Sequence, residues 1–387
     1  MQAIVRQPVK PEAPPAPLLV EALSGGVEVI ERLAAEWRAL CAESPFFQPE
    51  WIAAYVRAFA ADKQLIVFTA RRAGQLRAVL PLITERATLH GVPVRKLRSP
   101  SGVHSCRFDL VAGRGDEAAA VGAIWQALQQ RKGWDVIELL DMPEGGLGER
   151  LLDLAANAAF PVGQWQMPAA PYLPFVVSGV TTEERLAATL QQASTKRRND
   201  VRRLRRRLEE QDVVRVSCDE HATPAELARF YALERAGWKG QQGTAIACDE
   251  RLRQFYDAVA QTKAAQGQFL LYRLDVGEQT IAMQFCVTEG QTCYLLKPAY
   301  DESFRKYSPG NLLVAEVLPD LLARGLTEYD LLSPASEWKN YWTKTTRKQA
   351  HCYLFRRGFI GHALHAWKFQ VLRRVRQLRQ NYQSVSI

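Results

Sequence analysis

The sequence contains no run of apolar residues long enough to cross a lipid bilayer, which takes about 20 in a row. Its first residues, MQAIVRQPVKPEAPPAPLLVEAL, are rich in proline and lack the apolar core of a secretory signal peptide. These two absences predict a cytoplasmic protein without a membrane span. We expect residues 1–18 to form a disordered proline-rich tail.

The motifs of several enzyme classes are also missing. The sequence has no G-x-S-x-G, no Walker sequence and no H-E-x-x-H, so hydrolase and metalloenzyme functions are not favoured. The seven cysteines are scattered, form no C-x-x-C pair and have no histidine nearby at zinc spacing. We therefore expect buried, reduced thiols and no bound metal.

Positive charge is present in excess and lies mainly in two segments. The formal net charge is +9; residues 196–207 hold eight basic residues and one acid, and residues 356–380 hold seven basic residues and no acid. Nucleic acid, anionic lipid headgroups and acidic substrates would all attract such segments. A solvated helix face is the simpler explanation for the first segment.

Both basic segments also carry apolar residues at helical spacing. Val201, Leu204 and Leu208 form a stripe that would pack against the protein in the first segment. In the second, Phe369, Leu372 and Val375 alternate with cations, which is typical of a helix that binds a membrane surface or a partner.

The length of 387 residues favours two domains, because a single core stops growing at roughly 250 to 300 residues. In the first half, a helix in SPFFQPEWIAAYVRAF precedes the hairpin QLIVFTARRAGQLRAVLPLITE, the strand RFDLVAG, a helix and the strand WDVIELLDMPE. The second half repeats this order around the strand TCYLLKPAYD and the helix NLLVAEVLPDLLARG. This repetition indicates one α/β (α+β) fold used twice, each copy a mixed twisted sheet flanked by helices. A single large α/β domain is the alternative.

A strand-to-helix corner, KPAYDESFRKYSPGN, lies where ligands usually bind in such folds, at the carboxyl end of a strand that crosses to a parallel neighbour. Ser308 is a favoured N-cap residue, Pro309 suits the first helical position, and Gly310 permits a close turn. The first amides of the helix would attract phosphate or carboxylate, although Pro309 has no N–H to donate. Alternatively, the corner merely caps a core helix.

Four blocks of the second half resemble a known family: LQQASTKRRNDVRRLRRRLEE, ERAGWKGQQGTA, LLKPAYDESFRKYSPGNLL and EYDLLSPASEWKNYW. They are similar to the acetyltransferase domain of the GNAT superfamily found in CelD/BcsL-type proteins, which are linked with cellulose and other exopolysaccharide synthesis. A weaker resemblance reaches SPFFQPEWIAAYV and LRAVLPL in the first half. Distant relatives with the same doubled fold are the Fem-type peptidoglycan transferases, which use aminoacyl-tRNA. The resemblance implies two tandem GNAT-like domains.

The resemblance also implies a site for the acyl donor. GNAT enzymes bind the pyrophosphate of acyl-CoA at a corner with the pattern R/Q-x-x-G-x-G/A. Arg305, Ser308 and Gly310 stand at these spacings, with Ser308 in place of the first glycine. Together with Asn311 they are the expected contacts of acyl-CoA, with acetyl-CoA as the expected co-substrate.

The end of the predicted central strand offers Lys297, Tyr300 and Asp301. Alternation places Lys297 and Asp301 on one face, so we expect Lys297 and Tyr300 to bind substrate and Asp301 to accept a proton. A surface ion pair is the alternative.

Trp338, Lys339 and Trp342 follow the next predicted strand. The pair Trp338–Lys339 resembles the terminal aromatic–lysine motif of the Fem-type transferases, which makes Lys339 a charge-stabilising group near the acyl carbonyl and the two tryptophans substrate contacts. Alternatively, the tryptophans are core residues and Lys339 is solvated. We expect Asp301 and Lys339 to lie at one site, at the ends of adjacent parallel strands.

The segment ERAGWKG combines an aromatic residue with two cations just before a glycine-rich loop. Arg235, Trp238 and Lys239 are candidates for substrate binding, and Glu234 is a candidate base. A linker without function is the alternative.

The sequence thus predicts a GNAT-like domain at residues 19–165, an acyltransferase domain at residues 166–355 with a basic helix at 194–210, and a basic amphipathic helix at 356–387. The expected reaction moves an acyl group, most simply acetyl, from acyl-CoA to an amine or hydroxyl of a polysaccharide or lipid-linked sugar. The alternatives are a Fem-like transferase that uses aminoacyl-tRNA and an inactive accessory protein of a membrane synthase. Peripheral association with an anionic membrane is expected; RNA binding is not favoured.

Overall fold

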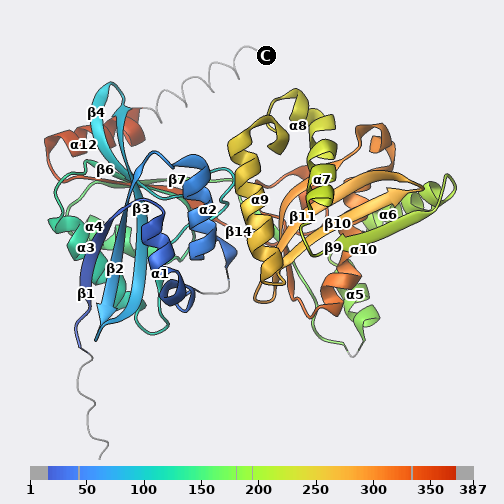
Figure 1. Ribbon diagram of the computed structural model, residues 1–387, viewed down its shortest axis with the longest axis horizontal. Coiled ribbons are helices and arrows are strands. Elements are labelled where there is room, and N and C mark those ends of the chain that lie inside the picture. The colour runs from blue at the N-terminus through green and yellow to red at the C-terminus, as the bar shows by residue number, and fades with distance from the viewer. Residues whose placement is uncertain (1–15, 42–43, 180, 194, 333, 372–387) are drawn as a thin grey trace, which may run out of the picture.

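The structure is a computed structural model, and it describes residues 16–41, 44–179, 181–193, 195–332 and 334–371. Two lobes lie side by side, each built on one sheet with helices packed against it (Figure 1). Each sheet has one parallel strand pair among antiparallel neighbours, so the predicted mixed α/β fold with two sheets is confirmed.

The first sheet has eight strands. Their order is β1 (Leu19–Gly25), β2 (Gln64–Arg72), β3 (Gln75–Leu89), β4 (Val92–Arg98), β6 (Val136–Pro143), β15 (Gln349–Phe355) and β7 (Val162–Gln166), with β5 (Val111–Ala112) paired to β3. Its helices are α1 (Glu28–Arg38), α2 (Pro49–Phe59), α3 (Glu117–Gln130) and α4 (Leu147–Asn157). The parallel pair is β4 with β6, joined through α3.

The second sheet has seven strands. Their order is β14 (Thr346–Arg347), β8 (Ala170–Pro174), β13 (Glu328–Asp330), β12 (Thr292–Tyr300), β11 (Gln279–Glu289), β10 (Phe269–Val276) and β9 (Val214–Asp219). Its helices are α5 (Thr182–Leu190), α6 (Thr195–Glu209), α7 (Pro224–Ala236), α8 (Trp238–Gln241), α9 (Glu250–Ala265), α10 (Pro309–Ala323) and α11 (Glu337–Asn340). The parallel pair is β12 with β13, joined through α10.

The central strand of the first half was predicted in the wrong place. The strand that pairs in parallel with β6 is β4, with the sequence VPVRKLR, whereas RFDLVAG forms only the short strand β5 within a loop. The charges of β4 hide its role, because they are paired within the sheet: Lys96 contacts Glu85 at 2.6 Å and Glu138 at 2.8 Å.

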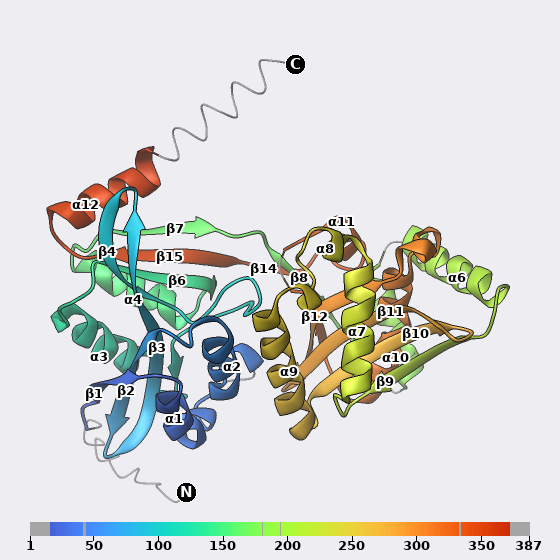
Figure 2. The ribbon, with the colours of Figure 1, turned by 45° about the horizontal axis from the view of Figure 1, so that its top comes forward.

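The boundary between the domains also differs from the prediction. Residues 349–355 were expected in the second domain, but they form β15, which lies between β6 and β7 and pairs with both in antiparallel register (Figure 2). Cys352, Leu354 and Phe355 are buried there. The chain passes from β7 of the first sheet to β8 of the second, and it returns to the first sheet at β15. It therefore crosses between the sheets twice.

An aromatic interface joins the two domains. Trp51, Tyr55 and Phe59, which the sequence places at every fourth position of α2, all lie against Phe255 of α9, with ring centroids 5.4, 6.4 and 5.7 Å apart. Nearby, Arg107 of the first domain forms a buried ion pair with Asp330. The domains are therefore held together by a shared core.

The basic helix α6 begins and ends close to the predicted bounds. Leu204 and Leu208 are buried and Val201 packs against the same core, so the predicted apolar stripe is confirmed.

Only part of the predicted tail helix can be compared with the structure. Residues 359–366 form α12 (Phe359–Ala366), followed by a π-helical turn at Trp367–Val371. Phe369 lies on Trp165 at 5.1 Å between ring centroids. Leu372 and Val375 lie outside the described residues, as does most of the predicted N-terminal tail. No helix of the described chain has the length and apolar character needed to cross a membrane.

Six of the seven thiols are buried or half-buried, as expected, but Cys248 is exposed. All seven are free. Within the described residues, no three or more His, Cys, Asp or Glu side chains gather to hold a metal ion.

Candidate functional site

The two parallel strands of the second sheet part soon after they meet. β12 and β13 pair only from Thr292 with Glu328 to Tyr294 with Asp330, and β12 then continues to Tyr300 paired with β11 alone. The start of α10 and the short helix α11 border the resulting gap. A cavity of about 460 Å³ opens there, lined by Pro298, Tyr300, Arg305, Ser308, Pro309, Gly310, Asn311, Glu337, Trp338 and Tyr341. Every residue predicted to bind acyl-CoA lines this cavity.

The corner at the start of α10 has an unusual backbone. Ser308 adopts the left-handed conformation, with φ 50° and ψ 53°, and its side chain makes no capping hydrogen bond. The serine is therefore at the predicted N-cap position without acting through its hydroxyl. Because glycine is the residue that adopts this conformation without strain, the geometry explains why the resembled pattern has glycine here.

Because Gly310 has no side chain, it leaves space in the cavity at the start of α10. A Cβ at this position would meet only one atom, Cδ1 of Tyr300, at 3.9 Å. The Gly310 amide has no acceptor within the described residues, while the amides of Asn311 and Leu312 bond to the carbonyl oxygen of Ser308. A free amide at the positive end of a helix, with Arg305 beside it, suits an anionic group.

Two of the predicted aromatic contacts have different roles. Trp338 lines the cavity. Trp342 is buried, and its Nε1 donates to Oδ1 of Asn311 at 3.1 Å, so it is a core residue that holds Asn311 in position.

Lys339 is a buried cation on α11 that follows the cavity-lining Trp338 but does not itself line the cavity. Only 9% of the residue is exposed, and its Nζ donates to the carbonyl oxygens of Leu332 at 2.9 Å and Pro334 at 3.1 Å. Burial lowers the pKa of Lys339 to about 8. The ammonium also lies 5.6 Å from the Trp338 ring, which lines the cavity.

Glu234 and Lys239 form a second buried pair. The Lys239 ammonium contacts Oε1 of Glu234 and the carbonyl oxygen of Pro298, each at 2.8 Å. The other oxygen of Glu234 accepts from the amide of Ile246 at 2.8 Å. Lys239 thus links Glu234 of α7 to β12. Since both carboxylate oxygens of Glu234 are engaged, a role as base would require this pair to open.

Lys297 lies half-buried between the domains without a hydrogen-bond acceptor or ion-pair partner among the described residues. Its Nζ stands 5.7 Å from the ring of Tyr256 on α9, and burial lowers the pKa of Lys297. Nδ1 of His104, from a loop of the first domain, lies 3.3 Å from the hydroxyl of Tyr256. Burial and the nearby Lys297 lower the pKa of His104 to about 4.

Sequence reasoning expected the first domain to shape the acceptor cleft but did not single out the residues that lie near Lys297. The loop that carries His104 also places Cys106 close to Lys297, with its backbone in a positive-φ conformation at 61°, and burial raises the pKa of this thiol to about 12. No motif pointed to these residues. A non-glycine residue at positive φ is a signal of strain, but only coordinates reveal it.

Asp301 has a local role that does not match a base. Its carboxylate accepts from the amide and hydroxyl of Ser303, at 2.9 and 2.7 Å, and from Nε2 of Gln279 on β11 at 2.9 Å. β11 lies on the opposite side of β12 from β13 and Lys339. Asp301 therefore caps the turn η3 (Glu302–Tyr307), and its place at one site with Lys339 stays a prediction.

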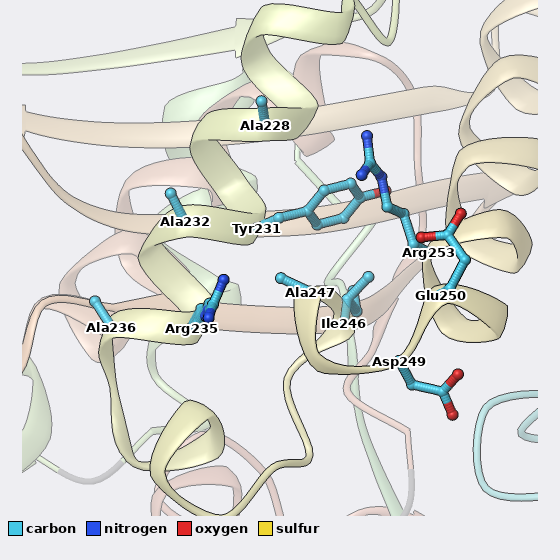
Figure 3. A pocket seen from close by; sticks show the side chains of 10 residues that line it. All are labelled: Ala228, Tyr231, Ala232, Arg235, Ala236, Ile246, Ala247, Asp249, Glu250 and Arg253. Atoms are coloured by element: carbon cyan, nitrogen blue, oxygen red, sulfur yellow. The ribbon is translucent and has the colours of Figure 1, made fainter.

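Arg235 and Trp238 do not line the cavity at the strand gap. The backbone amide of Trp238 donates to Glu302 at 2.8 Å, and its side chain is exposed. Arg235 instead lines a separate groove of about 620 Å³ between α7 and α9. Figure 3 shows this groove, with Tyr231 and Arg235 projecting from α7 opposite Arg253 on α9. Its lining is mixed: four alanines and Ile246 lie beside Tyr231, two arginines, Asp249 and Glu250.

The gap and the domain interface thus share a surplus of positive charge. The charge of Lys239 contributes to the lowered pKa of both Lys297 and Lys339, and Glu234 is the carboxylate bonded to Lys239. Such a site can bind an anionic donor at the corner and stabilise negative charge that develops beside Lys339.

Comparisons with known proteins agree with this geometry. Residues 195–340 match the family model described as Acetyltransferase (GNAT) domain. This segment begins with α6 and ends with α11, so it contains both the corner and Lys339. No curated protein matches the chain.

Solved structures with the same fold share little sequence. The crystal structure of FemX is similar over 87% of this chain and 98% of its own, with a TM-score of 0.56 and 12% identity. A protein of unknown function from Bacteroides thetaiotaomicron matches over 87% and 100%, with a TM-score of 0.50 and 12% identity. The C-terminal domain of a putative lysylphosphatidylglycerol synthetase from Agrobacterium fabrum matches over 84% and 91%, also with a TM-score of 0.50 and 12% identity. The doubled fold is therefore shared with FemX, and residues 195–340 are similar to the GNAT acetyltransferase domain family.

Proposed function

We propose that the protein is an acyltransferase that uses acyl-CoA, with acetyl-CoA as the expected donor. The observation that carries this proposal is the 460 Å³ cavity at the parting of β12 and β13, where the free Gly310 amide and Arg305 meet. The pyrophosphate would bind at this corner, because it is anionic and the helix start is positive. The extended amide-bearing arm of the donor would follow the free edge of β12 toward Lys339, as an added strand does.

The acceptor would approach from the domain interface. Its nitrogen or oxygen attacks the acyl carbon, the carbon–sulfur bond breaks, and the acceptor's proton finally resides on the released CoA thiol. The carbonyl oxygen becomes negative on the way, and the Lys339 ammonium, held by two backbone carbonyls in a buried place, is positioned to stabilise it. Asp301 and Glu234 are both engaged in bonds, so proton removal through water is the simplest route.

The acceptor class rests on the resemblance of the second half to CelD/BcsL-type proteins. We propose a sugar or lipid-linked sugar of an exported polysaccharide, with an amine or hydroxyl as the attacking group. The similarity to FemX concerns the fold, and a tRNA-dependent reaction would need RNA to bind the arginines that α6 exposes. Retained function without any CoA ester, together with salt-dependent tRNA binding, would favour that alternative.

Calorimetric titration with acetyl-CoA tests the proposal. The wild-type protein should bind, and Gly310→Leu should weaken binding by at least about tenfold, because the side chain would fill the cavity at the corner. Gly122→Leu is the matched control, since Gly122 lies on α3 of the first domain and a Cβ there meets nothing within 4 Å. Equal affinity of Gly310→Leu and the wild type would exclude the corner as the donor site.

A further inference from the structure

The inner side of helix α12 is well anchored to the first domain. Gly361 and Leu364 are buried, and Nε2 of His365 lies 2.9 Å from the carbonyl oxygen of Val162. Phe369 packs so closely on β7 that a Cβ at Gly163 would lie 2.5 Å from its ring. Phe369 therefore faces the protein, not a partner as its place in the predicted stripe suggested.

The outer side of α12 is also apolar, and nothing in the described chain covers it. Phe359 is 89% exposed, Ile360 61% and Trp367 49%. Ile360 and Trp367 are seven positions apart, which puts them on one helix face two turns apart. A helix that is apolar on both sides is usually buried on both. This helix is buried on one.

The exposed apolar surface continues onto the neighbouring hairpin. The ring of His90, at the turn between β3 and β4, lies 6.0 Å from the Trp367 ring, and Val92 at the start of β4 is 38% exposed. Figures 1 and 2 both place α12 beside this end of the first sheet. We call Phe359, Ile360, Trp367 and Val92 the outer apolar face.

Positive charge surrounds the outer apolar face. Arg356 and Arg357 directly precede Phe359, and Arg356 donates to the carbonyl oxygen of Arg131, which brings Arg131 and Lys132 to the same end of the helix. The nearest acid on that side, Asp135, is paired with Arg95 at 2.7 Å. From Arg356 to the last residue the sequence has seven basic residues and no acid. An anionic partner is therefore favoured over a neutral or basic one.

We propose that the outer apolar face docks on the surface of an anionic lipid bilayer. Exposed aromatic and aliphatic side chains enter the headgroup region, where an amphipathic Trp is stable, while arginines and lysines around them contact lipid phosphates. Each cation near such a surface contributes on the order of 1 kcal/mol, and the apolar side chains add to this. Because Asp135 is paired with Arg95, it adds little repulsion toward anionic lipid. An acidic protein would be attracted by the same cations, and the experiment below separates it from a bilayer.

Vesicle flotation with the full-length protein tests this inference. The wild type should float with vesicles of equal parts phosphatidylglycerol and phosphatidylcholine at low salt, and much less with phosphatidylcholine alone. The double variant Phe359→Ser/Ile360→Ser should lose at least about tenfold in bound fraction, because its insertion residues are gone. The matched control is Val177→Ser/Val213→Ser, which removes two valines of the second domain that are 55% and 58% exposed.

Three outcomes would overturn the inference. The first is equal flotation of the double variant and the wild type, which would place the membrane contact elsewhere. The second is equal flotation of the wild type with both kinds of vesicle, or with neither. The third is a wild-type dimer that the double variant converts to a monomer without any flotation, which would make the face a contact between copies of the chain. Flotation needs no substrate, so its outcome is independent of the proposed acyl transfer.

Discussion

The two domains contain the same strand crossover, but only one leaves space beside it. In the first domain β4 and β6 pair in parallel from Lys96 to Arg98, and in the second β12 and β13 pair in parallel from Thr292 to Tyr294. Both pairs then part. The two gaps differ in the groups that fill them. This difference separates the first domain, a structural copy, from the second domain, a binding copy.

The gap in the first domain is closed by its own chain. The amide of Leu140 on β6 donates to the hydroxyl of Ser99 at 2.9 Å, and the hydroxyl of Ser101 donates to the carbonyl oxygen of Leu140 at 3.2 Å. Tyr55 donates to the carbonyl oxygen of Ser101 at 2.8 Å. The loop after β4 thus satisfies the backbone groups of β6 that a ligand would otherwise reach.

Helix starts show the same contrast. At the start of α4 the carboxylate of Asp109 accepts from the amides of Leu147 and Gly148 at 2.8 and 2.7 Å, which occupies the positive end of that helix. Burial outweighs these bonds and raises the pKa of Asp109 to about 6. At the start of α10 no such carboxylate is present among the described residues, and the cavity meets the helix directly. The comparison suggests that the first domain supplies stability and one wall of the acceptor cleft.

The largest effect is expected for Lys339, because no cation of the first domain is proposed to play the same role. Lys339→Met should lower the rate of CoA thiol release by about 100- to 1000-fold, because the developing negative charge would lose its buried cation. The control is Lys96→Met, which removes a half-buried lysine of the first domain and should change stability but not the rate per folded molecule. A normal rate for Lys339→Met would assign Lys339 to structure alone.

A second prediction concerns the serines that close the first gap. Ser99→Ala leaves the buried amide of Leu140 without its acceptor and should lower the free energy of unfolding by about 1 to 3 kcal/mol. Ser336→Ala in the second domain should cost close to nothing, since its Oγ is buried without a partner among the described residues. Urea denaturation measures both. Similar losses for the two variants would mean that the closed gap adds no stability of its own.

The pH dependence of Lys339 gives a third prediction. Its pKa of about 8 means that the ammonium is lost above that pH, so the rate should fall up to about tenfold per pH unit there. The free energy of unfolding, by contrast, should rise with pH. The unfolded lysine has a pKa near 10.4, so between about pH 8 and that value the unfolded state binds more protons and stability rises with pH. Lys339→Arg should lack both trends, because arginine stays charged.

The fold and the strand-to-helix corner beside the cavity could be predicted from the sequence because their signals are local. The hairpins, the crossover helices and the Ser308–Gly310 corner all lie within short continuous stretches. The pairing of β15 with strands of the first sheet could not be predicted, since the residue pattern of a strand does not specify which strand it pairs with. Nor could the contribution of His104 and Cys106, which reach the second domain only through the aromatic interface. The hydrogen bonds of Asp301 were also beyond prediction, because alternation along a strand does not specify which neighbouring residue engages the side chain.

The smallest effect is expected at Ser308, where the corner and the backbone conformation coincide. Ser308→Gly should stabilise the protein by up to about 1 kcal/mol, because it removes a side chain from the left-handed conformation at φ 50°. Ala159→Gly, at φ 61° after α4 in the first domain, should give a similar gain and serves as the control. Thermal unfolding measures both. If the corner binds acyl-CoA, Ser308→Gly should also retain acetyl-CoA affinity. Ser308→Val adds a branched side chain to the cavity wall and should lose this affinity. Ala159→Gly should leave the affinity unchanged. Loss of affinity in Ser308→Gly would show that the hydroxyl itself contacts the donor. Serine at this position would then bind the donor directly and would not merely replace the glycine of the resembled pattern.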